Sequence, residues 1–232
     1  MATAGFFHPD IPPTEHTVRL DAHEAHHAKG ALRLRVGDRI KLLDGAGIIA
    51  DCVIEAISRD ALDASVISRE LIPAPARSVH IYCALPKGDR QRNLVDMLTQ
   101  IGIAEFTPIQ CERSVVKPKA INMERLQRIA IEACKQSHNP FLPVLHPPAD
   151  LKETIERACG AGEICLVADR GGKAIEVPAH GHLNVFIGPE GGFTTAELRL
   201  LSEAGAQSVG LGSNILRIET AAILLAGLLM LN

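Results

Sequence analysis

The chain has 232 residues, enough for one large or two modest domains. A hydrophobic fraction of 47% with no tryptophan predicts an aliphatic core and excludes a mainly disordered chain. The net charge of −3 by itself argues against a nucleic-acid partner.

In chain order, the first third favours a short helix at 16–30 followed by three strands. The strands are expected at 33–43, 48–57 and 62–67. Short strands at this spacing are typical of a small barrel. Residues 73–76, Pro-Ala-Pro-Ala, form a stiff, non-helical linker. The sequence therefore predicts one domain over 1–73 and a second over 77–232.

After the linker, apolar strands alternate with helices, which predicts an α/β fold with a mostly parallel sheet covered on both faces. The strands are expected at 79–85, 106–110, 164–168, 183–187 and 208–211. The helices are expected at 90–101, 122–137, 150–158, 195–204 and 216–231. The last helix is apolar all round, so we expect it to be buried inside the domain or in a subunit interface.

Charge is concentrated in the middle of the chain. Residues 77–136 carry a net charge of +4, whereas 1–76 carry −3 and 137–232 carry −4. Phosphate binding depends on local clusters of positive charge, so this segment could bind RNA. The simpler interpretation is a charged face that is only solvated.

Cysteine spacing and hydropathy indicate the cellular compartment of the protein. The six cysteines include no Cys-x-x-Cys pair, which predicts reduced, buried thiols. The most apolar run, 221–231, is shorter than the roughly 20 residues that a membrane span needs. We therefore expect a soluble, cytoplasmic protein with no membrane partner.

The strongest local motif is Ile187-Gly-Pro-Glu-Gly-Gly192, where an apolar strand runs into a glycine-rich loop and then a helix. Glycine lets backbone approach a ligand closely, and ligands settle at the carboxyl ends of parallel strands. A tight turn without a ligand is the alternative. The loop matches neither GxxxxGK[ST] nor GxGxxG, so a nucleotide hydrolase or an NAD site is not indicated.

The second motif, Leu211-Gly-Ser-Asn-Ile-Leu216, also ends a strand and feeds the last helix. Arg217 and Glu219 lie at the start of that helix, where two ionised groups need partners or a ligand. A salt bridge in an interface is the alternative explanation for this pair.

Together, the segments 187–192 and 211–221 resemble the paired signature of the ribosomal RNA small subunit methyltransferase E family, of the knotted (SPOUT) superfamily. Shorter segments fall in that family's order: Leu85-Pro-Lys-Gly88, Glu112-Arg-Ser114 and Glu132 to Ser137. The segment from His27 to Asp38 resembles its PUA-like RNA-binding domain. The resemblance covers essentially the whole chain, and it departs from the family pattern at Lys135, Asn139, Ser213, Asn214 and Ile218.

The resemblance implies a C-terminal SPOUT α/β domain with a trefoil knot and a parallel sheet, a small N-terminal PUA-like β-barrel, and a homodimer. It also implies S-adenosyl-L-methionine as the cofactor. The implied cofactor-binding residues are Leu166, Ile187, Gly188, Pro189, Glu190, Gly191, Gly192, Leu211, Gly212, Ile215, Leu216 and Arg217.

The implied reaction is methylation of N3 of a uridine in 16S rRNA of the small ribosomal subunit, at uridine 1498 in the decoding region. It needs no metal, because the sulfonium already activates the methyl group. Uracil N3 is a weak acid, so Arg217 is the candidate for stabilising the uridine anion, and Glu190 or Glu219 for accepting a proton. A knotted methyltransferase acting on another RNA and a non-catalytic RNA-binding adaptor are the alternatives.

RNA contacts are expected from basic residues in both domains, which position RNA rather than read its sequence. These residues are Lys29, Arg33, Arg35, Lys87, Arg90, Arg92, Arg113, Lys117 and Lys119. His23, His26 and His27 lack a cysteine or second cluster to complete a metal shell, so surface or RNA-facing histidines are favoured there.

Overall fold

The computed structural model describes residues 3–160 and 164–231, which fall into two compact units. The first unit comprises the chain up to Ala74 together with 131–142, and the second comprises 75–130 and the chain from Pro143 onward. The boundary after Ala74 lies in the proline–alanine linker. Sequence reasoning placed 131–142 in the second domain, whereas this segment packs with the first unit.

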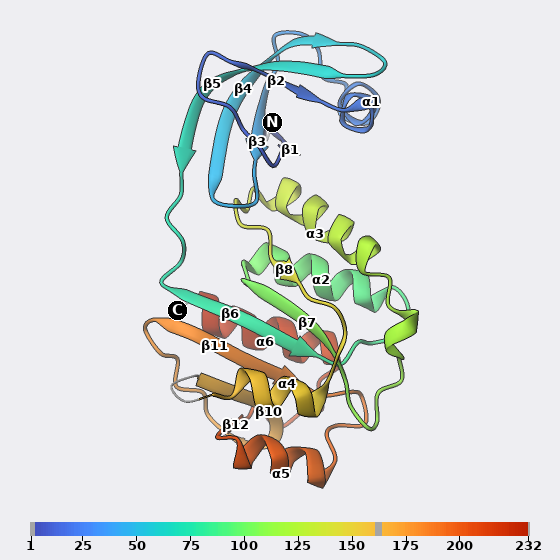
Figure 1. Ribbon diagram of the computed structural model, residues 1–232, viewed down its shortest axis with the longest axis vertical. Coiled ribbons are helices and arrows are strands. Elements are labelled where there is room, and N and C mark those ends of the chain that lie inside the picture. The colour runs from blue at the N-terminus through green and yellow to red at the C-terminus, as the bar shows by residue number, and fades with distance from the viewer. Residues whose placement is uncertain (1–2, 161–163, 232) are drawn as a thin grey trace. The chain divides into compact units, whose positions relative to one another are not determined.

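The first unit contains a five-stranded sheet in the order β1-β3-β4-β5-β2, helix α1 and the last turns, 131–137, of a helix that begins in the second unit (Figure 1). Its elements are β1 (Ala4–Phe7), β2 (Thr17–Leu20), α1 (Ala22–Gly30), β3 (Arg39–Leu43), β4 (Ile48–Ile57) and β5 (Leu62–Leu71). β1 pairs with β3 in parallel, and the other pairs are antiparallel. Inward-facing Phe6, Ile40, Leu42 and Ile54 are buried in a common core.

Two expectations for the first unit were wrong. Residues Thr17–Leu20 form a strand paired with β5, so the helix expected at 16–30 begins only after Asp21, whose side chain accepts from the Glu24 N–H. The strand expected from residue 33 begins at Arg39, because Arg33 has a positive φ of 56° and the Arg35 N–H donates to the Asp38 carboxylate at 2.7 Å.

The second unit is built on a seven-stranded sheet in which every pair is parallel. The strand order is β12-β10-β11-β6-β7-β8, with β9 also paired to β7. The strands are β6 (Arg77–Cys83), β7 (Glu105–Gln110), β8 (Val144–Leu145), β9 (Ala149–Asp150), β10 (Ile164–Lys173), β11 (Gly181–Ile187) and β12 (Gln207–Val209). The helices are α2 (Arg90–Ile101), α3 (Met123–Ser137), α4 (Leu151–Ala158), α5 (Thr195–Glu203), α6 (Ile218–Met230) and the short 3-10 helix η1 (Pro118–Ala120). Of α3, the residues from Ile131 onward belong to the first unit.

Helices cover both faces of this sheet. Tyr82 and Phe186 pack with Leu151 and Leu201 from α4 and α5, so alternate residues of β6 and β11 face those helices. On the other face α6 packs on β6 and against α2 (Figure 1). The predicted α/β class with a parallel sheet is therefore confirmed, and the trefoil knot stays a prediction.

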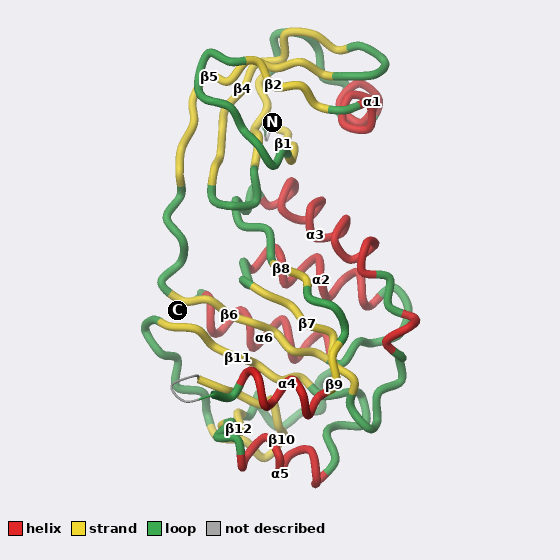
Figure 2. The backbone as a smooth tube through the Cα atoms, in the orientation of Figure 1, coloured by secondary structure: helices red, strands yellow, loops and turns green. Residues whose placement is uncertain are grey.

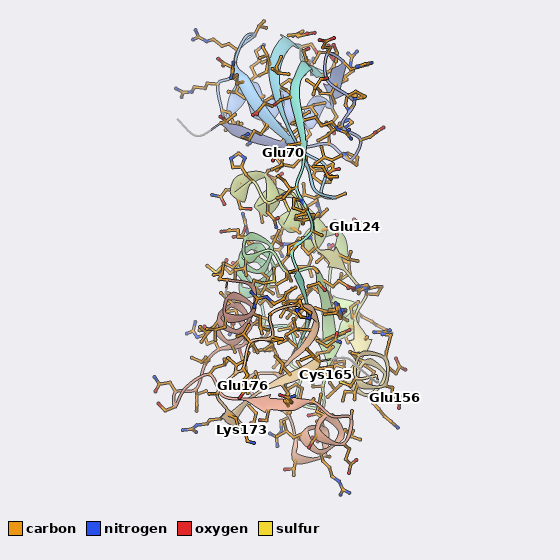
Figure 3. All side chains as sticks on the ribbon, turned by 90° about the vertical axis from the view of Figure 1, so that its left-hand side faces the viewer. Glu70, Glu124, Glu156, Cys165, Lys173 and Glu176 are labelled. Atoms are coloured by element: carbon orange, nitrogen blue, oxygen red, sulfur yellow. The ribbon has the colours of Figure 1, made fainter. Side chains whose placement is uncertain are left out.

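Helix α6 is only partly enclosed in the single chain: Leu225 and Leu229 are fully buried, whereas Leu224 is 41% exposed. No helix in residues 3–160 and 164–231 is long and apolar enough to cross a membrane. All six cysteines are thiols rather than disulfides. Cys165 lies inside the layers, whereas Glu156 and Lys173 are exposed (Figure 3). Loops, green in Figure 2, link the carboxyl ends of the strands to the helices that follow.

Candidate functional site

The two glycine motifs meet in one pocket of about 360 Å³. The loop after β11 supplies Pro189, Glu190, Gly191 and Gly192, and the loop after β12 supplies Leu211, Gly212, Ile215 and Leu216. The pocket lies at the edge of the sheet where parallel β10, β11 and β12 end. The sequence motifs are thus adjacent in space, although about 20 residues separate them in the chain.

Four of the residues expected to bind the cofactor do not line the pocket. Leu166 and Ile187 are buried in their strands just before the loops, and the Cβ position of Gly188 is occupied by the Phe193 ring. Arg217 is exposed at the N-cap of α6, directly after the lining residue Leu216.

Five further residues line the pocket that were not among the expected cofactor contacts: Ala168, Asp169, Arg170, Asn214 and Ala221. The first three come from β10, which forms the third wall. No motif marks them, because their position depends on pairing between β10 and β12. That pairing requires glycine: a Cβ on Gly172 would lie 2.3 Å from the Val209 carbonyl carbon.

A capping box fixes the first glycine loop. Gly192 has a φ of 70° and its N–H donates to the Pro189 carbonyl at 2.8 Å, which closes a turn. Thr194 caps α5 with Glu197, whose buried carboxylate accepts from the Thr194 N–H at 2.7 Å and from the Glu112 N–H at 2.8 Å. Glu197 therefore ties the loop to the segment 112–114.

Arg113 also supports this loop. Its guanidinium donates to the Gly191 carbonyl at 2.8 Å, and a Cβ on Gly191 would lie 3.3 Å from Arg113 Cδ. Sequence reasoning named Arg113 only as an RNA contact, whereas the structure places it against the pocket wall.

Arg90 joins the acidic residues of the two motifs. It lies 2.6 Å from Glu190 Oε1 and 3.8 Å from Glu219 Oε2. That Glu219 oxygen is buried and accepts no hydrogen bond within the described part of the chain. The negative charges of Glu190 and Glu219, the residues expected to accept a proton, are therefore compensated by Arg90. Arg90 was expected to contact RNA, but it forms ion pairs at the pocket instead.

The other residues expected to contact RNA are exposed in their own units. Lys29, Arg33 and Arg35 are exposed in the first unit; Lys87, Arg92, Lys117 and Lys119 are exposed in the second. Arg217 is exposed too, and among residues 3–160 and 164–231 no carboxylate forms a salt bridge with it. These cations are free to meet a phosphate or an anionic base.

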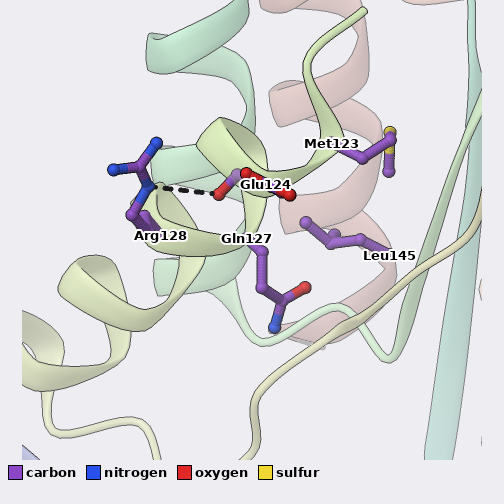
Figure 4. Close-up of a pocket in the computed structure, with 5 residues that line it drawn as sticks. All are labelled: Met123, Glu124, Gln127, Arg128 and Leu145. Carbon is purple, nitrogen blue, oxygen red and sulfur yellow. Dashed lines mark hydrogen bonds between the residues drawn. The ribbon is translucent and has the colours of Figure 1, made fainter.

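A larger hollow of about 570 Å³ lies elsewhere in the second unit, lined by Met123, Glu124, Gln127, Arg128 and Leu145 (Figure 4). Arg128 Nε donates within α3 to the Glu124 carbonyl at 3.4 Å (Figure 4). The lining has no glycine loop and no residue of the two glycine motifs, so size alone does not make it the functional site.

Two families of known proteins match this chain, one in each part of the sequence. Residues 73–230 match the family described as "RNA methyltransferase domain", and residues 20–67 match "RNA methyltransferase PUA domain". The ribosomal RNA small subunit methyltransferase E of Mycobacterium bovis is 31% identical over 98% of this chain and 91% of its own length. That of Bacillus subtilis is 32% identical over 88% of this chain and 86% of its own length.

A solved structure shares the fold over nearly the whole length. The ribosomal RNA small subunit methyltransferase E of Neisseria gonorrhoeae, bound to S-adenosyl methionine, superposes with a TM-score of 0.90 at 25% identity. The match covers 98% of this chain and 96% of that one.

The parallel sheet, the glycine-lined pocket at its carboxyl edge and the additional N-terminal strand sheet define an RNA methyltransferase with a PUA domain. Within that class, the chain belongs to the ribosomal RNA small subunit methyltransferase E family.

Proposed function

We propose that this protein transfers a methyl group from S-adenosyl-L-methionine to N3 of a uridine in 16S rRNA of the small ribosomal subunit, at the position equivalent to uridine 1498. The observation that carries the proposal is the meeting of both glycine motifs in one pocket, in a chain of this family. When bound, the donor supplies a methyl group already activated by its sulfonium.

The pocket chemistry fits an adenosyl group. Leu211 and Leu216 are apolar neighbours for a purine, and Ile215 is 80% exposed, so covering it with an apolar ring is favourable. Gly191 and Gly212 leave backbone N–H and carbonyl groups within reach of a ligand. Asp169 adds an acceptor suited to hydroxyl groups such as those of ribose.

Arg217 is assigned to the target base. Methylation at N3 requires negative charge on the uracil ring, and a fixed cation beside that charge lowers the barrier to its formation. Arg217 follows the pocket-lining residue Leu216, is held by the start of α6 and has no competing ion pair in the described chain.

Glu190 and Glu219 are assigned to holding the pocket. A carboxylate paired with a guanidinium is a weak proton acceptor, because protonation would forfeit the ion pair. Arg90 links these residues across the two loops, so we expect it to position the loops while the N3 proton leaves to water.

The two domains divide the work. We assign RNA binding to a PUA-like domain over 1–73 and methyl transfer to the domain over 77–232, with Lys29, Arg33, Arg35, Lys87, Arg92 and Lys117 contacting phosphates. A cytoplasmic homodimer acting without a catalytic metal completes the proposal. The family resemblance and the partly exposed apolar helix α6 support the dimer.

Calorimetry with S-adenosylmethionine and transfer of a labelled methyl group to 16S rRNA test this function. Gly191→Val should weaken cofactor binding about 10–100-fold, because the branched side chain would crowd the pocket wall and press on Arg113, whose Cδ lies 3.3 Å from the added Cβ. Gly30→Val is the matched control, since nothing beyond its chain neighbours and its own helix backbone lies within 4 Å of the Gly30 Cβ position. Absence of cofactor binding in the unaltered protein would favour a non-catalytic adaptor, and label appearing in another RNA would redirect the substrate assignment.

A further inference from the structure

A second polar cluster lies on the α4 and α5 face of the sheet, in the amino-terminal half of the strands, away from the glycine loops. Asn184 of β11, His80 of β6 and Glu105 of β7 are neighbours in register across three adjacent strands. They line a pocket of about 580 Å³ together with His146, His182 and other residues of the second unit. Nothing in the proposed methyl transfer uses this cluster.

Three side chains of the cluster bring metal-ligating atoms together. Glu105 Oε2 lies 2.6 Å from His146 Nε2 and 3.5 Å from His80 Nδ1. All three ligand atoms lie within 4.8 Å of one another, and no other such group occurs in residues 3–160 and 164–231. Two imidazole nitrogens and one carboxylate oxygen form a ligand set suited to zinc and similar divalent cations.

The ring of His80 is already oriented for this role. Its other nitrogen, Nε2, lies 2.7 Å from Thr107 Oγ1. With Nε2 donating to that hydroxyl, Nδ1 keeps its lone pair and points toward Glu105. Thr107 thus orients the ring, as the outer-shell partner of a metal-binding histidine does.

The backbone fixes His146. It lies between β8 and β9, which both pair with β7, and its N–H donates to the Phe106 carbonyl at 2.9 Å. Pro147 and Pro148 follow and restrict the backbone further. The third ligand is therefore held in place before any cation arrives.

We propose that His80, Glu105 and His146 bind one divalent cation of the zinc class, with water in the pocket filling the remaining coordination positions. The cation takes the place of the Nε2 proton of His146, whose ring then carries its proton on Nδ1. A cation bound there would fix the segment 144–149 to the sheet. It is separate from the methyl-transfer pocket, whose reaction needs no metal, and it does not depend on the proposed function.

Zinc titration of the metal-stripped full chain tests the site, by calorimetry with ZnCl₂ and by visible absorption with CoCl₂. We expect one equivalent per chain. His146→Ala and Glu105→Gln should each weaken zinc binding by about 100-fold or more, and Thr107→Val by about 10–100-fold, the usual cost of losing an outer-shell partner. Because the unaltered protein is titrated first, failure of a variant to fold leaves the test intact.

Two controls separate this site from other histidines. His182→Ala removes a histidine of the same pocket outside the ligand set, and His23→Ala with His27→Ala removes the pair on α1. Both should bind zinc within about twofold of the unaltered protein, because neither variant removes an atom of the proposed ligand set. No saturable binding by the unaltered protein, unchanged binding in His146→Ala, or loss of binding in either control would overturn the proposal.

Discussion

Arg90 and Arg217 lie near the same pocket yet have different surroundings. Arg90 is paired with Glu190 and Glu219, one acidic residue from each glycine motif. Arg217 is exposed and has no carboxylate partner in the described residues. The sequence predicted an RNA contact for Arg90 and a role beside the target base for Arg217. The ion pairs show that Arg90 holds the pocket, whereas Arg217 is left able to meet a substrate.

Replacing Arg217 with alanine should lower the rate of methyl transfer about 10²–10³-fold, the usual cost of removing a group that stabilises developing negative charge. Cofactor affinity should stay within about threefold, because Arg217 does not line the pocket. Single-turnover transfer and calorimetry measure the two effects. Arg199→Ala, at an exposed pair on α5, is the control. Equal losses of rate and affinity would contradict the role given to Arg217.

At the scale of elements, helix α5 anchors the first glycine loop through Glu197. Replacing Glu197 with alanine leaves the N–H groups of Thr194 and Glu112 without their acceptor. We expect a loss of about 2–3 kcal/mol in the free energy of unfolding, measured with urea. Glu203→Ala on the same helix removes only an exposed pair with Arg199 and should cost less than about 0.5 kcal/mol. Similar losses in both variants would refute the anchor.

Lys135 joins α1 to the end of α3 within the first unit. Its side chain is 5% exposed and lies 2.8 Å from Glu24 and 2.9 Å from Glu132. Burial alone would lower the pKa of Lys135, but hydrogen bonds with Glu24 and Glu132 outweigh it and raise the pKa. The stability gained is complete below the usual lysine pKa and is lost as pH rises through the higher, folded value.

Lys135→Met should therefore destabilise the protein by about 3–5 kcal/mol, because Glu24 is left with an uncompensated charge. Lys152→Met, at an exposed position on α4, should change stability by less than about 0.5 kcal/mol. Urea unfolding at neutral pH measures both. The unaltered chain should lose its advantage over Lys135→Met at strongly alkaline pH, and a difference that grows with pH would contradict this assignment.

Long periodic elements could be predicted from the sequence, whereas short paired ones could not. The helix expected at 90–101 has those bounds in the structure, because its apolar face repeats and Gly102 caps it with a φ of 93°. Strands β1, β2, β8 and β9 were missed, since two to four residues carry no period and their strand character comes from distant partners.

The same reasoning explains which residues of the pocket could be predicted from the sequence. Glycine loops that follow apolar strands are a local signal, and both loops line the pocket. Asp169 and Arg170 carry no such signal, because β10 reaches the pocket only through its pairing with β12. The grouping of His80, Glu105 and His146 likewise arises from strand register, which a single sequence does not reveal.

For the whole molecule, RNA affinity should depend on cations in both units. Reversing Arg33 and Arg35 to glutamate should weaken binding of 16S rRNA and reduce the salt slope of log K by about 1–2, since each phosphate contact contributes about 0.7–0.9. Arg59→Glu, an exposed arginine of the same unit, is the control. An unchanged slope in the double variant would remove these arginines from the RNA-binding surface.

Mass mapping of 16S rRNA from cells that lack this protein tests the central claim most directly. The account predicts that N3 methylation of one uridine in the decoding region is lost, that the unaltered gene restores it, and that Gly191→Val does not. A mark that persists without the protein, or that Gly191→Val restores in full, would contradict a methyl-donor pocket built from the two glycine loops.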